Sequence, residues 1–475
     1  MTTSARTRAA VLATTVVNAL SRRFGAGSGT VAGGHAGLAL DPRLLEHLAS
    51  NRRIALVSGT NGKTTTTRLL AVAVQGSLGR PATNATGSNM PTGHVTALAG
   101  APPGAPAVLE VDEGYLPGLV TSLSPEVVVL LNLSRDQLDR TNEVRMVASK
   151  WRAALAGASR TTVVANADDP LVVWAASSAP HPYWVGAGLE WLADAVGCPA
   201  CEGRITFAGS SGRSGPGGRG GPGGRAGAGL WRCECGFGRP SLDVRLEDDD
   251  VVLADGRRVR LELALPGRFN RSNAAMAAAG AAALGVPWQE SLPRIALVEE
   301  VAGRFAVVEV GGCTARMMLA KNPAGWRELL DLVCPGDTPL VVGINARIAD
   351  GRDPSWLWDV PFERLRGRMV VATGERCRDL SVRLRYAEVA HRTVRDPVAA
   401  VRAAHIGAGG ALGRSGGDRA PDPAPDPAPD LVPRPVPRPV PVDFIGNYTA
   451  FSDLMARACA RRGAPDAREG SPAWT

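Results

Sequence analysis

From about residue 51 onward, short runs of apolar residues, most of them rich in β-branched side chains, alternate with polar or amphipathic segments. Four runs are nearly continuous stretches of apolar residues: 54–57, 108–111, 127–131 and 162–165. A strand that is apolar at almost every position is buried on both faces, as in a parallel sheet covered by helices. The pattern therefore predicts an α/β fold with a parallel-rich sheet.

A second set of strand-like runs follows at 305–309, 339–343 and 369–372. The sequence between the two sets, near 298–303, marks an expected domain boundary, and 475 residues suffice for two or three domains. We expect a helical or irregular lead-in, a central domain and a smaller α/β domain, over residues 1–50, 51–300 and 301–475.

The N-terminal apolar segment, residues 9–20, has about the length of a signal-peptide core. Ser21, Arg22 and Arg23 follow it in place of a clear cleavage site, so an N-terminal helix is preferred over a secretory signal. No other apolar run is long enough to span a bilayer. We therefore expect the protein in the cytoplasm.

Two segments have compositions that cannot bury enough surface to fold. Residues 209–229 are almost entirely Gly, Ser, Arg and Pro, which predicts a flexible loop. Residues 407–442 become rich in alternating proline, which predicts a disordered or extended polyproline spacer. An insertion is preferred there over a ligand for an SH3-type domain, because α/β patterning resumes on both sides.

A net charge of +8 and a pI near 9.4 favour anionic partners. The arginines are spread along the chain, so charge alone does not choose among nucleic acid, membrane and small anions. Eight cysteines in a chain of this length do not form the disulfide framework of a small secreted domain.

The strongest motif is Gly59-Thr60-Asn61-Gly62-Lys63-Thr64-Thr65, directly after the first apolar run and before a helical pattern over 65–74. Glycines let backbone N–H groups approach phosphate, and the start of a helix adds its positive dipole end. Lys63 would neutralise phosphate oxygens and Thr64 would ligate magnesium. The motif predicts nucleotide binding by all seven residues.

The spacing of this loop differs from the generic phosphate loop, which has four residues between its first glycine and Gly-Lys. The position of that earlier glycine is Val57 here. The compact form resembles the Mur ligases and the related folylpolyglutamate synthases. The resemblance implies ATP and Mg²⁺ as cofactors, and a reaction in which an amine displaces phosphate from an acyl phosphate.

Several downstream residues match the family in order. Glu110 resembles the acidic magnesium ligand, although it is also an ordinary strand-end carboxylate. Asn132 and Asp136 are similar to the family's Asn-x-x-x-Asp segment, where Gln137 replaces a frequent histidine. Lys150 falls near a position that is a carbamoylated lysine in several members, and a solvated helix lysine is the alternative.

Three further positions complete the expected nucleotide site. Asn270 lies in a segment that resembles the one beside adenine, and the bare pattern predicts an asparagine that caps a helix. Arg304 matches an arginine that reaches the phosphates. Lys321 is also expected at phosphate, but Leu319 stands where many members have an aspartate for the ribose.

Cys198-Pro-Ala-Cys201 and Cys233-Glu-Cys235 frame the segment 198–235. Two such pairs converge on one tetrahedral ion, which predicts an inserted zinc ribbon, although the second pair is one residue shorter than usual. Four free thiols or a redox pair are the alternatives. A nucleic-acid-binding ribbon is less favoured, because aromatic residues near the cysteines are few and no basic stacking platform is evident.

A Mur-type domain with such a ribbon resembles the amidating branch of the family, the ligase subunits of lipid II isoglutaminyl synthases. The resemblance extends over 319–326 and 349–359. It implies that ATP activates the α-carboxylate of D-glutamate in the lipid II stem peptide, which ammonia converts to D-isoglutamine. The expected place of action is the inner face of the cytoplasmic membrane. A same-fold ligase that adds an amino acid, and a nucleotide-gated nucleic-acid module, are the alternative functions.

The chain shows no ammonia-producing site of its own. A class I glutaminase needs a cysteine in a tight turn and a histidine base, and neither Cys313 nor the six histidines sit in such a motif. The resemblance implies a heterodimer with a class I glutaminase, GatD-like, to which this chain lends an aspartate that orients the catalytic histidine. The candidates are Asp350, Asp353 and Asp359, with Asp353 preferred; all three also fit turn or helix caps.

Two tryptophans lie beside these aspartates in the sequence. Trp356 and Trp358 are expected either as anchors of an interface with the glutaminase or as packed core residues.

Overall fold

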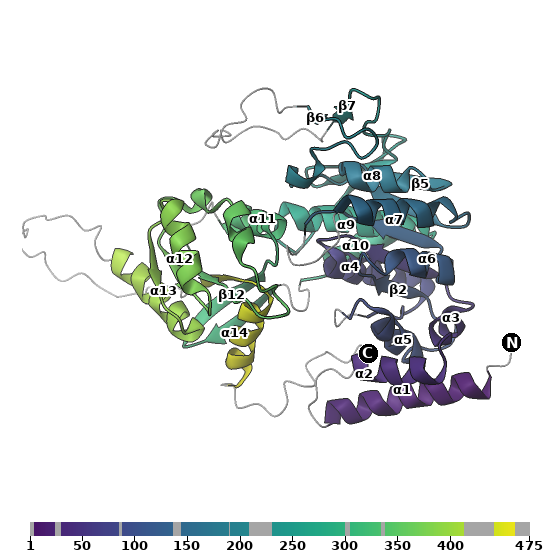
Figure 1. The fold of residues 1–475 in the computed structure, drawn as a ribbon, viewed down its shortest axis with the longest axis horizontal. Coiled ribbons are helices and arrows are strands. Elements are labelled where there is room, and N and C mark those ends of the chain that lie inside the picture. Colours follow the sequence, from purple (N-terminus) through teal and green to yellow (C-terminus); the bar gives the residue numbers. More distant parts are fainter. Residues whose placement is uncertain are drawn as a thin grey trace, which may run out of the picture. The chain divides into compact units, whose positions relative to one another are not determined.

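The computed structural model describes residues 4–23, 30–84, 88–135, 144–189, 191–208, 230–299, 305–333, 338–412 and 441–460. The chain divides into two compact units, one before and one after the junction of Ala302 and Gly303. Each unit has its own sheet and its own hydrophobic core (Figure 1).

The first unit is built on an eight-stranded sheet in the order β10-β9-β8-β5-β4-β3-β1-β2. The strands from β8 to β2 in this order are parallel, and β9 and β10 are antiparallel additions. The predicted parallel-rich sheet is therefore confirmed. The strands are β1 (Ile54–Ser58), β2 (Ala107–Glu110), β3 (Val127–Leu130), β4 (Thr162–Asn166), β5 (His181–Gly186), β8 (Val244–Glu247), β9 (Asp250–Leu253) and β10 (Arg258–Arg260).

Helices cover both faces of this sheet, which is why its central strands are apolar at every position. Alternate residues of β1 enter two different cores: Val57 packs with one set of helices and Leu56 with the other. The first set is α4 (Lys63–Leu78), α9 (Arg268–Ala283) and α10 (Trp288–Ala296). The second set is α3 (Leu44–Ala49), α5 (Pro91–Ala99), α6 (Leu116–Leu123), α7 (Val144–Ala156) and α8 (Pro170–Ala176).

Two helices precede the sheet: α1 (Ala5–Arg23), which is the predicted N-terminal helix, and α2 (Thr30–Leu40). They lie side by side and both contact α5 (Figure 1). None of the described helices is long and apolar enough to cross a membrane.

The four-cysteine segment is inserted between β5 and β8. Its described part contains a short helix, η1 (Ala193–Ala195), and an antiparallel pair, β6 (Ile205–Phe207) and β7 (Trp231–Cys233). The expected flexible loop, 209–229, lies outside the described residues.

The second unit has a six-stranded sheet in the order β11-β12-β16-β13-β14-β15. Only β11 is antiparallel to its neighbour. Val341 and Phe444 face a core formed with α13 and α14. Helix α12 packs on β14 and β15, and Trp326 of α11 is fully buried. The elements are β11 (Phe305–Val310), β12 (Cys313–Leu319), α11 (Pro323–Val333), β13 (Leu340–Gly343), η2 (Ser355–Asp359), η3 (Phe362–Leu365), β14 (Val370–Thr373), α12 (Cys377–Tyr386), β15 (His391–Thr393), α13 (Pro397–Leu412), β16 (Val442–Gly446) and α14 (Tyr448–Ala460).

The chain reverses direction in this sheet. It runs outward from β13 through β14 to β15, and α13 then returns it to β16, which lies between β12 and β13. A reversal of this kind leaves a crevice at the carboxyl ends of the strands.

The helix α13 continues to Leu412, so the proline-rich spacer begins later than residue 407, where we expected it. Residues 407–412 contain only Gly, Ala and Leu, and the first proline of the spacer is Pro421. None of these residues is proline, so none removes a helix hydrogen bond as proline would. Residues 413–440 lie outside the described part of the chain.

Candidate functional site

The loop between β1 and α4 requires glycine at two positions. Gly59 has φ +141°, and a Cβ there would lie 2.9 Å from Leu131 Cβ. Gly62 has φ +84°, and a Cβ there would lie 2.3 Å from Asn273 Oδ1. Both the backbone conformation and the close approach of neighbours exclude a side chain. The sequence motif therefore folds into the tight turn that a phosphate loop needs.

The helix α4 begins at Lys63 with Gly62 in the N-cap position, and no side chain caps it. Gly62 has no side chain with which to cap the first amide N–H groups of this 16-residue helix. Amide N–H groups at the positive end of a helix dipole favour an anion. Thr64 and Thr65 lie in this first turn, where the motif placed them. The geometry fits the phosphates of a nucleotide.

Lys63 is folded back onto its own loop. Its Nζ donates to the carbonyl oxygen of Gly59 at 2.5 Å and to that of Thr60 at 3.2 Å. It also forms an ion pair with Glu113 Oε2 at 3.2 Å. Only 4% of Lys63 is exposed, so these acceptors replace water around its charge. Glu113 was not assigned a role from the sequence, although it ends the same acidic segment as Glu110.

The residues after β3 hold the loop in place. Asn132 accepts from the backbone N–H of Asn61 at 2.9 Å and donates from Nδ2 to the carbonyl of Asn61 at 3.1 Å. Its own carbonyl accepts from the N–H of Thr60 at 2.9 Å, and Thr60 Oγ1 exchanges hydrogen bonds with the Ser134 backbone. Asn132 is therefore next to the loop, as its assignment to nucleotide binding requires. Asp136 and Gln137 lie outside the described residues.

Glu110 ends β2 at the same edge of the sheet, because the register pairs it with Val57 of β1. It is 3% exposed. The side chain of Asn84 holds its backbone by two hydrogen bonds of 2.8 Å, and His94 Nε2 donates to its carbonyl at 2.8 Å. Burial lowers the pKa of His94, so the ring is neutral. A carboxylate at this position, beside the first turn of α4, suits a divalent cation.

The start of α9 lies beside the loop, because Asn273 reaches Gly62. The expectation that Asn270 caps this helix is wrong. The N-cap residue is Gly267, with φ +95°, and Asn270 lies in the first turn, where its Nδ2 donates to the carbonyl of Pro266 at 2.7 Å. A left-handed residue before the helix requires glycine and moves the helix start ahead of the asparagine.

Three further predicted residues belong to other segments of the chain. Lys150 is exposed on α7, with no hydrogen bond or ion pair among the described residues, which suits a solvated lysine. Lys321 follows β12 in the second unit. Arg304 lies outside the described residues.

The four predicted cysteine ligands do converge. The Sγ atoms of Cys198, Cys201, Cys233 and Cys235 all lie within 4.8 Å of one another. Two of the separations are 3.7 Å, for Cys198 and Cys235, and 3.5 Å, for Cys201 and Cys233. Four ligands at about 2.3 Å from a tetrahedral zinc ion would be about 3.8 Å apart. The short Cys-x-Cys pair therefore does not prevent a metal-binding geometry.

This cluster is attached to the core of the first unit. Trp231 donates from Nε1 to the carbonyl of Ala167 at 3.0 Å, and its ring packs on Phe237 at 5.1 Å. A hydrogen bond from the backbone of Phe237, and then one from Cys201, lower the pKa of Cys235 to about 7. Arg239 forms a buried ion pair with Asp168 at 2.6 Å. The contacts of Trp231 and Arg239 thus attach the four-cysteine segment to residues that follow β4. β4 belongs to the same sheet as β1, which precedes the nucleotide loop.

In the second unit the three candidate aspartates have different environments. Asp350 is 3% exposed and its carboxylate accepts from the N–H and hydroxyl of Thr449. Asp353 is exposed and accepts from the N–H and hydroxyl of Ser355 at 2.9 and 2.8 Å, which lowers its pKa. Asp359 is exposed at the end of η2. Asp350 is therefore occupied in holding α14, whereas the other two carboxylates face solvent.

The two tryptophans have different roles. Trp356 is 5% exposed and stacks on Trp326 at 6.2 Å, which makes it a core residue. Trp358 is 55% exposed and contacts Tyr386, which is 71% exposed, edge to face at 5.3 Å. Arg383 lies 5.6 Å from the ring of Trp358. Only Trp358 is available as an interface anchor.

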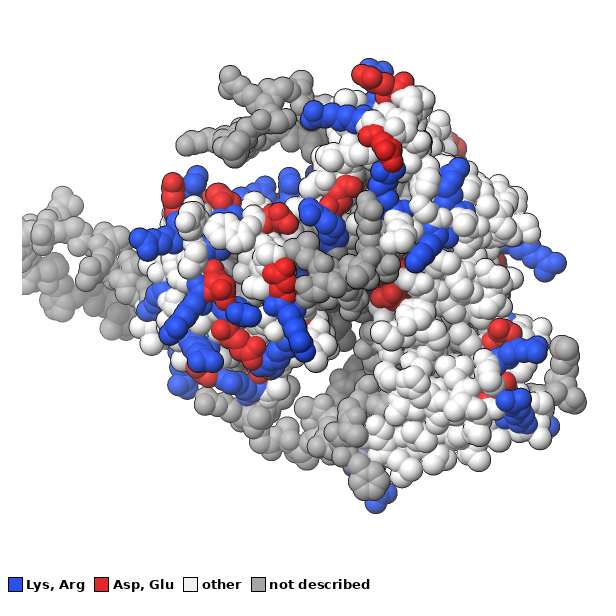
Figure 2. All heavy atoms as spheres, viewed as in Figure 1, with Lys and Arg blue, Asp and Glu red and all other residues white. Residues whose placement is uncertain are grey.

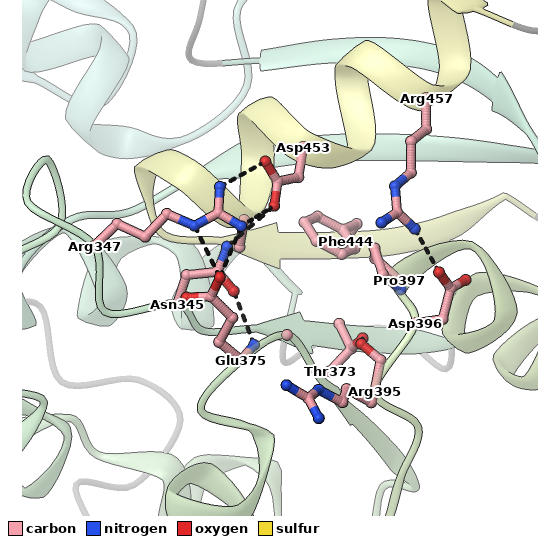
Figure 3. A pocket seen from close by; sticks show the side chains of 12 residues that line it. Asn345, Arg347, Thr373, Glu375, Arg395, Asp396, Pro397, Phe444, Asp453 and Arg457 are labelled. Atoms are coloured by element: carbon pink, nitrogen blue, oxygen red, sulfur yellow. Dashed lines mark hydrogen bonds and ion pairs between the residues drawn. The ribbon is translucent and has the colours of Figure 1, made fainter.

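A pocket of about 390 Å³ opens at the carboxyl ends of β13, β14 and β16, where the chain reverses direction (Figure 3). Arg347 lines it and forms ion pairs with Glu375 and Asp453, both at 2.8 Å. The backbone N–H of Arg347 also donates to Asp350 at 3.3 Å. Arg347 thus links the pocket to Asp350, three residues before Asp353.

The fold and the compact phosphate loop together define the class of protein as Mur ligase-like. Two family models match: the Mur ligase middle domain over residues 57–190 and the MurT ligase C-terminal domain over 319–405. Solved structures agree at the level of the fold. A pseudomurein peptide ligase type C from Methanothermus fervidus has a TM-score of 0.58 at 18% identity, over 86% of this chain and 79% of that one. MurF from Acinetobacter baumannii has a TM-score of 0.58 at 14% identity, over 90% and 81%.

Relatives of known name are more similar in sequence. The MurT subunit of the lipid II isoglutaminyl synthase (glutamine-hydrolyzing) from Streptococcus pneumoniae is 30% identical over 71% of this chain and 77% of that protein. The MurT subunit from Staphylococcus aureus strain COL is 28% identical over 74% and 81%. The chain belongs to the MurT group of the Mur ligase family.

Proposed function

We propose that this chain is the ligase subunit of a lipid II isoglutaminyl synthase in peptidoglycan synthesis. It would amidate the α-carboxylate of D-glutamate in the lipid II stem peptide, with ATP as the source of energy and ammonia as the nitrogen donor. The product is D-isoglutamine. The observation that carries this proposal is the 30% identity to the pneumococcal subunit across both units of the chain.

The nucleotide site of the first unit supports the use of ATP and Mg²⁺. The amides of the Gly59–Thr65 loop and the Lys63 ammonium would bind the phosphates, with Asn270 near the base. Thr64 and Glu110 are the oxygen ligands suited to Mg²⁺. Transfer of the γ-phosphoryl group to the glutamate carboxylate gives an acyl phosphate, and ammonia then displaces phosphate. Arg304, Lys321 and Asp136 are assigned to the same nucleotide as part of this proposal.

Ammonia would come from a partner, a GatD-like class I glutaminase. The aspartate lent to its catalytic histidine is Asp353, which is exposed and has a lowered pKa, so it is ionised at neutral pH. Trp358, which is exposed five residues after Asp353, would anchor the partner. The four-cysteine cluster would hold a structural Zn²⁺, since all four ligands are protein thiols and no open position is needed.

The test is reconstitution of the chain with its glutaminase, lipid II, ATP, Mg²⁺ and glutamine. We expect mass spectrometry of the muropeptide to show one amidated carboxyl group, with one phosphate released for each amide formed. Lys63→Met should abolish amidation but leave glutamine hydrolysis by the partner. Incorporation of a labelled amino acid in place of ammonia would instead identify an amino-acid-adding ligase, and steep salt-dependent binding of DNA or RNA lost on chelation would identify a nucleic-acid module.

A further inference from the structure

Helix α1 presents its large apolar side chains to solvent. Leu12, Val16 and Leu20 follow one another at intervals of one turn and are 64%, 46% and 48% exposed. The opposite, buried face carries small and polar residues: Thr7, Ala10, Thr14 and Asn18. A helix on the surface of a soluble protein normally has the reverse pattern, with its apolar stripe toward the core.

The orientation of α1 is fixed by specific contacts with α2 and the residues that follow it. A Cβ on Gly33 would lie 2.0 Å from Asn18 Oδ1, and a Cβ on Gly37 would lie 2.2 Å from Thr14 Oγ1. The two glycines therefore bring α2 against the polar face of α1. Thr7 Oγ1 also donates to Asp41 at 2.9 Å. The helix cannot turn its leucines inward without losing these contacts.

The charge around this face is of one sign. Residues 4–40 contain four arginines, two near each end of α1, and neither aspartate nor glutamate. The area occupied by α1 and α2 in Figure 1 is largely white in Figure 2, which shows few charged side chains over it. Val31 and Leu40 of α2 add further exposed apolar surface, 49% and 46% exposed.

An apolar helix face bordered by arginines matches the interface of a bilayer that contains anionic lipid. The acyl boundary takes the leucine and valine side chains, and lipid phosphates lie at the level of the guanidinium groups. A second copy of the same face fits less well, because it would place arginines near arginines and offers no carboxylate to pair with them.

We propose that the outer face of α1 is a membrane-docking surface for anionic phospholipid, with Leu12, Val16 and Leu20 at the acyl boundary. The surface would hold the enzyme on the membrane whether or not a lipid-linked substrate is present. The proposal therefore goes beyond the proposed function and does not depend on the reaction assigned to the nucleotide site.

The test is sedimentation of the full chain with vesicles of phosphatidylcholine alone or mixed with phosphatidylglycerol. We expect binding to the mixed vesicles that weakens with added salt. The triple variant Leu12→Gln/Val16→Gln/Leu20→Gln should lower the partition coefficient by at least about tenfold. A matched triple, Val196→Gln/Val307→Gln/Met369→Gln, replaces side chains that are 53%, 50% and 58% exposed elsewhere and should bind as the unchanged protein does.

Two results would overturn the proposal. The first is equal vesicle binding by both triple variants and the unchanged protein. The second is a change of oligomeric state in the α1 variant, measured by light scattering, while its vesicle binding stays the same. Circular dichroism and thermal unfolding are the controls for the folding of each variant. Amidation of a water-soluble muropeptide, assayed in parallel, separates failure of this proposal from failure of the proposed function.

Discussion

The ammonium group of Lys63 lies 3.2 Å from Glu113 Oε2, and the two side chains are only 5% and 16% exposed. In the same position the ammonium donates to the carbonyl of Gly59 at 2.5 Å. The lysine that would bind phosphate is thus already neutralised by the protein. We therefore expect phosphate to compete with Glu113 for this ammonium, so that the carboxylate stabilises the nucleotide-free loop and limits nucleotide affinity.

We predict that Glu113→Gln lowers the free energy of unfolding without nucleotide by about 1–3 kcal/mol, because it leaves a buried ammonium without its counter-charge. Added nucleotide should restore more stability to this variant than to the unchanged protein. Thermal unfolding with and without ATP and Mg²⁺ measures both effects. Glu126→Gln, which removes an exposed ion pair with Arg53, is the matched control and should change neither by more than about 1 kcal/mol. A smaller nucleotide effect in Glu113→Gln would show that the carboxylate assists binding.

Gly62 and Gly79 allow a second test, because they begin and end the same helix and both have a positive φ, +84° and +82°. Their ψ angles differ, −8° at Gly62 and 174° at Gly79. An added Cβ meets Asn273 at Gly62 and meets nothing within 4 Å at Gly79. Both alanine variants should lose stability through backbone strain, about 1 kcal/mol at Gly62 and about 1–3 kcal/mol at Gly79, whose φ and ψ are almost restricted to glycine. Only Gly62→Ala should also lower nucleotide-dependent activity, by about a hundredfold, because the loop must move. Equal activity of the two variants would contradict this account of the loop.

Several features of the fold and of the candidate site could be predicted from local sequence. The parallel strands and the nucleotide loop were found because each depends on neighbouring residues: a buried strand is apolar throughout, and a tight turn needs glycine at fixed spacing. The cysteine cluster was found for the same reason, since pairs of ligands that are close in sequence share one ion.

The features that the sequence did not reveal depend on contacts between distant segments. The pairing of Lys63 with Glu113 requires the register of β1 on β2, which no local pattern gives. The different burial of Trp356 and Trp358 depends on where α11 and α12 pack. The start of α9 was misplaced because a left-handed glycine, rather than the more common asparagine, precedes it.

The cysteine cluster predicts a dependence on metal. Cys235→Ser should lower bound zinc, measured by elemental analysis, and lower the free energy of unfolding by about 2 kcal/mol or more. A strong chelator should produce the same loss in the unchanged protein. Cys377→Ser removes a buried cysteine outside the cluster and is the control that should keep its zinc. Full zinc content in Cys235→Ser would refute the assignment of this ligand.

The buried position of His94 leads us to predict that the stability of the protein depends on pH. Burial lowers its pKa below the ordinary 6.5, and its Nε2–H holds the carbonyl of Glu110. The folded state therefore binds fewer protons than the unfolded state just below that pH. The stability that neutral His94 contributes is complete above about pH 6.5 and is lost as the pH falls toward its lowered pKa. Chemical unfolding over this range should show that the free energy of unfolding falls more steeply with decreasing pH in the unchanged protein than in His94→Gln. The glutamine amide can donate to the same carbonyl. If the free energy of unfolding depended on pH equally in both proteins, other groups would cause the acid sensitivity.

The three candidate aspartates of the second unit can be separated because they differ in exposure and in hydrogen bonds. Asp350→Asn should destabilise the second unit by about 1–3 kcal/mol, since it weakens the hold on Thr449. Asp353→Asn should leave stability within about 1 kcal/mol but lower glutamine hydrolysis by the partner complex by about 10²- to 10⁴-fold, as loss of the orienting carboxylate does in other triads. Asp359→Asn should change neither quantity.

Comparison of glutamine hydrolysis among the three variants decides which aspartate orients the histidine. The complex must remain intact in each variant. Gel filtration must show that every variant still binds the glutaminase, and nucleotide binding by the first unit must be unchanged. If Asp359→Asn lowered glutamine hydrolysis while Asp353→Asn did not, the carboxylate at the end of η2 would be the one that orients the histidine. Asp353 would then have only a structural role, because its carboxylate accepts hydrogen bonds from Ser355, the first residue of η2.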